Sequence, residues 1–362
     1  MTDREWELVK RCAACEPVEA VPLAWIVDSP WIPGYCGVST LDFYADLQLR
    51  LDCYRRIKRE LPGILLFPDY WMEFGMMAEP SGYGCRPAFF SNQPVSCAPL
   101  LEDPEEIGQL VDLPVPDPNR DGLMPLAIAQ YRRIKQPLHD AGEKIRMVAS
   151  RGPLNIASFL MSISGLCMAI KLEPAAVHRV LHNTTQLVKR WLLAQMEALD
   201  YVEGILVLDD ICGFLSEADY AEFAEPYLAE IFRAFDVPVK MFHNDNFSNG
   251  YITFPSMARL GINLFNFSHQ AEMGRARREL GETVCIFGNL APYDCLTQAS
   301  PAQCAREATR ILDAHGAARG LILSGGGGAS MGMPRENMLA VQRALQQWNA
   351  RHASRWPPGC SP

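Results

Sequence analysis

Eight short apolar runs, each followed by a longer segment of mixed polarity, recur along this chain of 362 residues. Each run is rich in β-branched residues and ends in a polar or glycine-containing cluster, which indicates a strand. The runs are nearly continuous in apolar residues, as strands are when helices cover both faces of a parallel sheet. The eight predicted strands cover residues 21–28, 64–70, 146–152, 204–210, 237–243, 262–268, 284–290 and 320–325.

The longer segments between these runs carry apolar residues at the 3.6-residue spacing of amphipathic helices. Ser300 followed by Pro301 supplies an N-cap and a first-turn proline, and acidic residues at 217–219 mark another helix start. Eight strands that alternate with helices predict one α/β domain over residues 1–362, a (β/α)8 TIM barrel, with an open doubly wound sheet as the alternative. The predicted helices cover residues 40–61, 174–199, 217–235, 301–316 and 334–351.

The interval between the second and third predicted strands, residues 71–145, is rich in proline and has little apolar periodicity. Because such a segment cannot build a core of its own, we expect an insertion over the barrel mouth rather than a second domain. The residues before the first strand form an N-terminal extension.

Acidic side chains outnumber basic ones by 42 to 33, which gives a formal charge of -9. This charge disfavours binding to nucleic acid or to anionic lipid, and no basic run offsets it. Residues 1–12 lack the apolar core of a secretory signal, so the predicted location is cytoplasmic. The uncharged stretch at 154–170 is short for a bilayer and contains polar residues, so we expect a buried helix there.

The 12 cysteines lack the regular spacing of a secreted disulfide framework. We expect most of them to be reduced and buried. Cys12 and Cys15 form the one C-x-x-C motif, and without a second such pair or a preceding strand this motif indicates neither a zinc site nor a redox site.

Polar side chains stand where the predicted strands end, and in a barrel these ends meet at one mouth, the usual place of the active site. Side chains alternate across a strand, so residues two apart at a strand end face the same way. The polar residues at or next to the strand ends are Asp28, Asp69, Arg151, Asp209, Asp210, His243, Asp245, Ser268, His269, Asn289 and Ser324.

His243 and Asp245 are two residues apart, and imidazole with carboxylate suits zinc or a similar divalent ion; the alternative is a hydrogen bond between the two or to nearby backbone. Asp209 and Asp210 are consecutive, so they cannot point to the same side; we expect one to face a ligand and the other to cap the following loop, although such a pair can also serve only to stabilise a turn. Cys212 is a candidate thiolate ligand, or a small buried side chain.

Asp69 precedes Trp71, Met76 and Met77, and an acid beside aromatic and thioether surface suits a bulky, partly apolar ligand. The alternative is that these side chains belong to the core and Asp69 pairs with Arg151. The glycine run at 325–328 lacks the lysine of a phosphate-binding loop and indicates that a ligand or a lid approaches the backbone closely there. The sequence has neither a G-x-S-x-G nor an H-E-x-x-H motif, which argues against a serine hydrolase and a zincin.

Six segments in order along the chain together resemble the uroporphyrinogen decarboxylase superfamily. That superfamily contains the decarboxylase itself and the cobalamin-dependent methyltransferases of one-carbon metabolism in anaerobes. The resemblance extends over about residues 20–350 and implies the TIM barrel already inferred from the strand pattern. The segments are 65–75, 152–160, 208–213, 242–245, 287–292 and 323–338.

The decarboxylase arm resembles a site with an N-terminal arginine cluster, an acid at Asp69, a nearby tyrosine and a histidine in the last loop. Here residues 12–39 contain no arginine, Phe159 has no hydroxyl and Gly327 replaces the histidine, so a tetrapyrrole with many carboxylates would lack its counter-charges. The methyltransferase arm resembles a zinc site of His-x-Cys plus a later cysteine. His243 matches it, Asp245 replaces the first cysteine and Gly327 the second, which resembles relatives that use ether or amine donors.

The resemblance therefore implies a methyltransferase that moves a methyl group between a small ether or amine donor and a corrinoid carried by a partner protein, with zinc or an acid assisting. The alternatives are a decarboxylase acting on a tetrapyrrole and a non-catalytic barrel that binds a corrinoid or a partner. A homodimer is also expected. The predicted site residues are His243, Asp69 and Asp210 for catalysis, His243, Asp245 and Cys212 for the metal, and Trp71, Met76, Met77, Arg151, His269 and Asn289 for the substrate.

Overall fold

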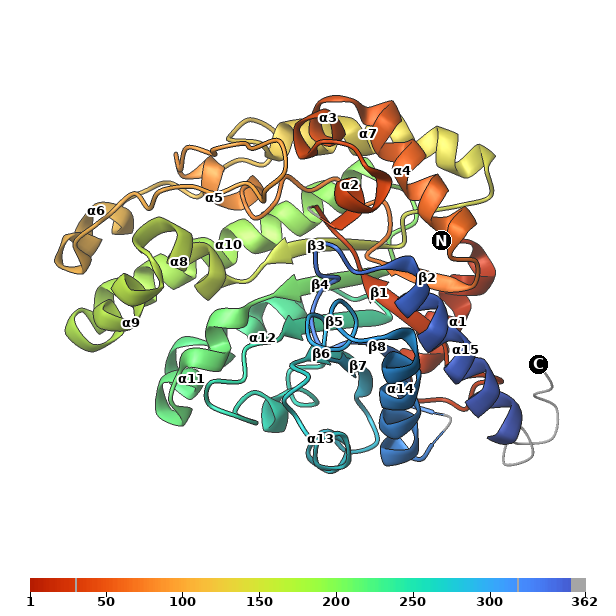
Figure 1. The fold of residues 1–362 in the computed structure, drawn as a ribbon. Helices are drawn as coiled ribbons and strands as arrows, with labels where there is room; N and C mark the ends of the chain where they lie inside the picture. The colour runs from red at the N-terminus through yellow and green to blue at the C-terminus, as the bar shows by residue number, and fades with distance from the viewer. Residues whose placement is uncertain (30, 318, 353–362) are drawn as a thin grey trace.

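Eight parallel strands form one curled sheet with helices around its outside, which confirms the predicted (β/α)8 barrel (Figure 1). The structure is a computed structural model that describes residues 1–29, 31–317 and 319–352. The strand order is β2-β1-β8-β7-β6-β5-β4-β3, and all pairs are parallel. The strands are β1 (Leu23–Ile26), β2 (Ile64–Phe67), β3 (Met147–Arg151), β4 (Gly204–Leu208), β5 (Val239–Asn244), β6 (Leu264–Phe267), β7 (Cys285–Leu290) and β8 (Leu321–Gly325).

The helices agree with the sequence pattern over α10, α14 and α15, but two predicted helices are each divided in two. Asp46 is extended and its carboxylate accepts the amide hydrogens of Gln48 and Leu49, so a new helix begins there. Pro226 lies in the first turn of α12 and forces a start after Ala224. The longer helices are α1 (Asp3–Ala13), α4 (Leu47–Glu60), α7 (Met124–Asp140), α8 (Pro153–Met161), α9 (Ile163–Leu172), α10 (Pro174–Ala198), α12 (Glu225–Ala234), α13 (Met273–Leu280), α14 (Pro301–His315) and α15 (Arg335–His352). The shorter ones are α2 (Trp31–Cys36), α3 (Thr40–Ala45), α5 (Ala78–Gly82), η1 (Pro104–Ile107), α6 (Gly108–Val111), η2 (Asp210–Phe214), α11 (Glu217–Phe223) and η3 (Phe254–Ser256).

The segment between β2 and β3 is more ordered than its composition predicts. Its last part is the 17-residue α7, which buries Ala127, Tyr131, Ile134 and Leu138 against the barrel wall and is the helix that the βαβ unit requires. Prolines at both ends of α7 hid this periodicity in the sequence. The insertion proper is therefore shorter than predicted, and it packs on α8, α9 and α10 through α5, η1 and α6.

The uncharged stretch at 154–170 is two helices rather than one. Ser162 has a φ of 65° and separates α8 from α9, and the two helices meet at 101°. Within the described ranges no single helix has the length and apolarity to cross a membrane, and only this bent pair passes when taken together. The predicted buried helix is right for α8, whereas α9 exposes Ile163, Met168 and Leu172.

All eleven cysteines in the described ranges are free thiols, and most are buried. Burial raises the pKa of Cys12 to about 12. The twelfth, Cys360, lies outside the described residues.

The barrel interior is filled by every second residue of each strand. The inward side chains form a cluster separate from the one between sheet and helices, and it includes Met147 and Ala149 of β3 and Val239 and Met241 of β5. Helix α1 covers the N-terminal ends of the strands. The Trp6 ring lies so close to Gly204, the first residue of β4, that a Cβ there would be 2.9 Å from it. The bottom of the barrel is therefore closed, and the other end carries the polar groups.

Among the described residues β2 and β3 share no ladder, and charged side chains fill this seam instead. Asp69, just after β2, is 1% exposed and accepts hydrogen bonds from the Lys58 ammonium at 2.7 Å and the Met1 α-amine at 2.6 Å. Lys58 also pairs with Glu143, which leads into β3. Burial by itself would raise the pKa of Asp69, but the two cationic groups hold it below its ordinary value.

The ion pairs in this seam predict that Asp69 stabilises the folded protein. We expect Asp69→Ala to lower the free energy of unfolding by roughly 3 kcal/mol, because it leaves the buried Met1 amine without its carboxylate and Lys58 with Glu143 alone. Since the folded-state pKa is lowered, the stabilisation is present above the unfolded pKa of about 4 and is lost as pH falls through the folded value. Urea unfolding at neutral and acid pH measures both, with exposed Asp112→Ala as control. Equal stability of the two variants at neutral pH would refute the role.

Candidate functional site

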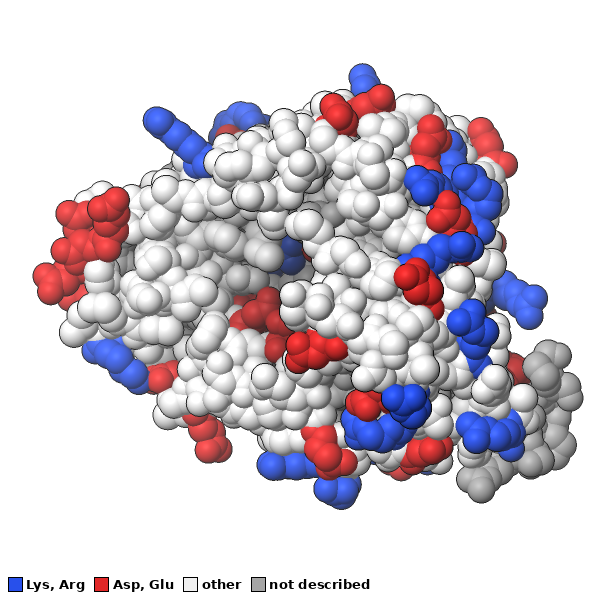
Figure 2. Space-filling model, viewed as in Figure 1, with Lys and Arg blue, Asp and Glu red and all other residues white. Residues whose placement is uncertain are grey.

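Polar side chains replace the apolar filling of the barrel at the C-terminal ends of the strands. Alternation continues inward from Ala149 to Arg151 on β3, from Met241 to His243 on β5 and from Leu264 to Asn266 on β6. The space-filling view shows a hollow in the centre of this face with acidic side chains at its rim and basic atoms deeper inside (Figure 2). The polar mouth expected from the strand ends is present.

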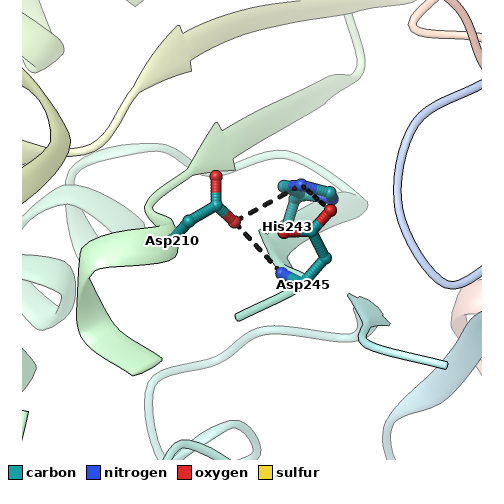
Figure 3. A group of neighbouring side chains, drawn as sticks. All are labelled: Asp210, His243 and Asp245. Carbon is teal, nitrogen blue, oxygen red and sulfur yellow. Dashed lines mark hydrogen bonds and ion pairs between the residues drawn. The ribbon is translucent and has the colours of Figure 1, made fainter. Parts of the chain in front are cut away.

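Asp210, His243 and Asp245 form a compact group in this mouth (Figure 3). One ligand atom from each lies within 4.8 Å of the others. His243 Nε2 is 3.5 Å from Asp210 Oδ1 and 3.9 Å from Asp245 Oδ2, and Asp210 Oδ1 also accepts the Asp245 amide hydrogen at 3.1 Å. His243 is buried, whereas the two carboxylates are partly exposed toward the hollow. Nitrogen and oxygen donors that converge with one open side are what a catalytic divalent metal requires.

Asn266 fixes the orientation of the His243 ring. Its side-chain nitrogen donates to the carbonyls of Phe287 at 2.6 Å and Gly325 at 2.9 Å, so its oxygen must face His243 Nδ1, 2.6 Å away. Nδ1 is therefore the donor, and Nε2 is directed at the two carboxylates. Asn266 was not predicted as a site residue from the sequence. Its position two residues after the inward-facing Leu264 indicates that its side chain also faces the barrel interior.

The two carboxylates repel each other, and their surroundings make this repulsion costly. The pKa of Asp245 is raised, first because the walls of the mouth displace its hydration and then because Asp210 carries the same charge, while His243 opposes the shift. A divalent cation between the three side chains would remove the repulsion. The donor set and its outer partner Asn266 thus fit a bound metal ion.

Asp209 and Asp210 have separate positions, as their adjacency predicted. Asp209 is fully buried and its Oδ2 accepts the Leu154 amide hydrogen at 3.0 Å at the start of α8. Asp210 begins η2 and turns into the mouth. Cys212 is fully buried among the residues outside the barrel and is not part of the triad, so the prediction that it ligates the metal is wrong. One turn of η2 carries its side chain to the opposite side of the loop.

The glycine run after β8 lies directly against the triad. A Cβ on Gly326 would be 2.3 Å from the His269 nitrogen, and one on Gly327 would be 2.7 Å from Asp245 Oδ2. Gly327 also has a φ of 137°, which other residues avoid. The groups that approach this run closely are therefore the His269 backbone and the Asp245 carboxylate, whereas the predicted ligand or lid stays a prediction.

Two predicted site residues, Asp69 and Met77, do not line the mouth, and the roles predicted for Met76 and Asn289 stay predictions. Asp69 is held in the seam by Lys58 and the Met1 amine, not by Arg151 and not beside His243, because the chain turns at positive φ after β2. Met77 is fully buried in the outer core, whereas Met76 is exposed. The Asn289 amide is used by the carbonyls of Ser268 and Ala271.

The other predicted substrate residues do lie at the mouth. Trp71 belongs to the inward cluster, and the Arg151 guanidinium lies over its ring at 5.2 Å. His269 is exposed and close enough to Asp245 to lower the pKa of that carboxyl. Asp28 joins them from β1. Burial, and next to it the charge of Glu73, raise the pKa of Asp28 to about 7, while Arg151 and His243 oppose the shift.

Comparison with known proteins places this barrel in a family. The family model described as Uroporphyrinogen decarboxylase (URO-D) matches residues 68–348, and the chain belongs to that family. Proteins named uroporphyrinogen decarboxylase from Aromatoleum aromaticum and Pectobacterium carotovorum are 28% and 27% identical to it, over 92% and 97% of this chain and 93% and 100% of theirs. A solved methyltransferase from Methanosarcina mazei has the same fold, with a TM-score of 0.78, 16% identity and coverage of 94% of this chain and 97% of its own.

The different roles of Asp209 and Asp210 can be tested by measuring the stability of the protein. We expect Asp209→Ala to lower the free energy of unfolding by about 1–3 kcal/mol, because the buried Leu154 amide hydrogen loses its acceptor. Asp210→Ala should change it by less than about 1 kcal/mol, since its carboxylate is partly exposed and faces another carboxylate. Thermal and urea unfolding of both variants measure the difference. A larger loss for Asp210→Ala would show that the roles are reversed.

Proposed function

We propose that this chain is a methyltransferase that moves a methyl group between a small ether or amine donor and a corrinoid carried by a partner protein. The observation that carries the proposal is the group formed by Asp210, His243 and Asp245, with His243 oriented by Asn266. The methyltransferase fold of the Methanosarcina mazei protein supports it. The proposed ion is zinc, held by these three side chains.

In the proposed reaction the methyl group leaves its donor and is transferred to the corrinoid cobalt. The C–heteroatom bond breaks with its electron pair on the heteroatom, and cobalt(I) of the partner corrinoid supplies the pair for the new bond to carbon. A bound zinc ion would act as a Lewis acid on the departing heteroatom. His243 and the two carboxylates face the open side of the mouth, so a donor there reaches the metal position directly, while the apolar filling below excludes water.

A second candidate is decarboxylation of a tetrapyrrole, which the names of the sequence relatives favour. Against it, residues 12–39 carry no arginine for the substrate carboxylates, and Asp69 is occupied by cationic groups of the seam. The proposed reaction needs neither feature.

Metal binding is the first test. Protein incubated with zinc and then freed of excess metal should retain it stoichiometrically by mass spectrometry, and cobalt(II) should give the visible bands of a low-coordinate site. His243→Ala should abolish retention, and Asn266→Ala should weaken it roughly 10- to 100-fold because the ring loses its outer partner. Exposed His182→Ala is the matched control. Wild type that retains no metal would refute a metal-assisted reaction.

Activity is the second test. Metal-loaded protein mixed with cob(I)alamin and a panel of methyl ethers and methylamines should convert the cob(I)alamin spectrum to that of methylcobalamin. His243→Ala should lower kcat by about 10²- to 10³-fold, the loss usual for a group that stabilises developing charge. Parallel incubation with uroporphyrinogen measures carbon dioxide. Release of carbon dioxide without any methyl transfer would favour the decarboxylase.

A further inference from the structure

Arg151 is a buried cation at the barrel mouth, and no described residue accepts a hydrogen bond from its guanidinium. It is 5% exposed, and among the described residues its guanidinium makes no hydrogen bond and no ion pair within 4 Å. An arginine stays charged at any physiological pH, so burial of its hydrogen-bond donors without acceptors is unfavourable. Such a side chain is stable only if a ligand anion or water reaches it from the hollow.

The surroundings hold this guanidinium in place but do not occupy its hydrogen-bond donors, although the charges of Glu79, Asp28 and Glu73 act on it from beyond ion-pair distance. The guanidinium lies over the Trp71 ring at 5.2 Å, which fixes the side chain through a cation–π contact. Glu79 uses Oε1 to accept hydrogen bonds from the Arg151 backbone nitrogen and the Ser150 hydroxyl. Glu73 is engaged by the Ser29 amide hydrogen and lies 4.0 Å from Arg50. The planar fork of donors is therefore preformed for an oxyanion.

The strand register places Arg151 and the triad around one ligand-sized space. Arg151 pairs with Leu208, and Leu208 pairs with His243, so the three residues lie at one level of the barrel and point inward. Two strand spacings separate Arg151 from His243, about 10 Å between their Cα atoms. One small molecule can thus touch both side chains, with the apolar Leu208 between them.

We propose that Arg151 binds a carboxylate of the methyl donor, so that the substrate is a small carboxylic acid that carries a methyl ether or methylamine group. This inference rests on the proposed methyltransferase function for the methyl group, while the anion site stands on the geometry of Arg151 itself. A carboxylate forms two parallel hydrogen bonds with the guanidinium fork. The methyl-bearing end then points toward the position between His243 and the two carboxylates.

The test compares each acid with its neutral amide. The probes are 3-methoxybenzoate and 3-methoxybenzamide, and dimethylglycine with its amide, titrated into the full-length protein by calorimetry without corrinoid. Wild type should bind at least one acid roughly 10- to 100-fold more tightly than its amide, the effect of charge-assisted hydrogen bonds. Arg151→Gln should abolish this preference, and Arg151→Lys should retain part of it. Exposed Arg86→Gln is the matched control, and thermal unfolding verifies that each variant is folded.

Two outcomes overturn the proposal: no acid binds at millimolar concentration, or the acid preference survives in folded Arg151→Gln. Failure of the proposed function is a separate result. An Arg151-dependent acid preference that persists in His243→Ala, without methyl transfer by wild type to cob(I)alamin, supports the anion site and refutes the methyltransferase. Methyl transfer from neutral donors that does not depend on Arg151 supports the methyltransferase and refutes the anion site.

Discussion

In-register pairing of parallel strands is the constraint on which the site depends. When Arg151, Leu208 and His243 pair along neighbouring strands, their side chains must face the same side of the sheet and lie at the same height. The curl of the sheet turns that side into the barrel interior. A shift of one residue in β5 would move His243 into the outer core and leave the metal site without its nitrogen ligand.

Asn266 determines which nitrogen of the His243 ring carries the hydrogen. A histidine at a strand end can present either ring nitrogen, and the choice determines whether it donates or accepts. Because the Asn266 amide nitrogen donates to backbone carbonyls of β7 and β8, its oxygen is left for His243 Nδ1. Three neighbouring strands thus cooperate to direct His243 Nε2 at the carboxylates, and the site is organised by the barrel rather than by a local motif.

Asp69 and Asp210 have different roles although both directly follow a strand. Both acids follow a strand, and the sequence assigns both to the mouth. The short β2 leaves a seam beside β3, and the chain there turns at positive φ so that Asp69 meets Lys58 and the Met1 amine. An acid that is fully buried beside two cationic groups stabilises the barrel at its weakest point. Asp210, next to another carboxylate and open to the hollow, is left for a ligand.

The sequence by itself determined the eight strands, most of their helices, the family and the pairing of His243 with Asp245, because periodicity and residue spacing are local properties of the chain. Helix α7 was not predicted because prolines near both of its ends obscure its apolar periodicity, and its buried face is evident only from the packing. Tertiary structure alone decided that Asp210 and not Cys212 joins His243, that Asn266 orients it, and that no described residue accepts a hydrogen bond from the Arg151 guanidinium. These relations join residues on different strands, and their distances depend on the register and closure of the barrel, which no local pattern encodes.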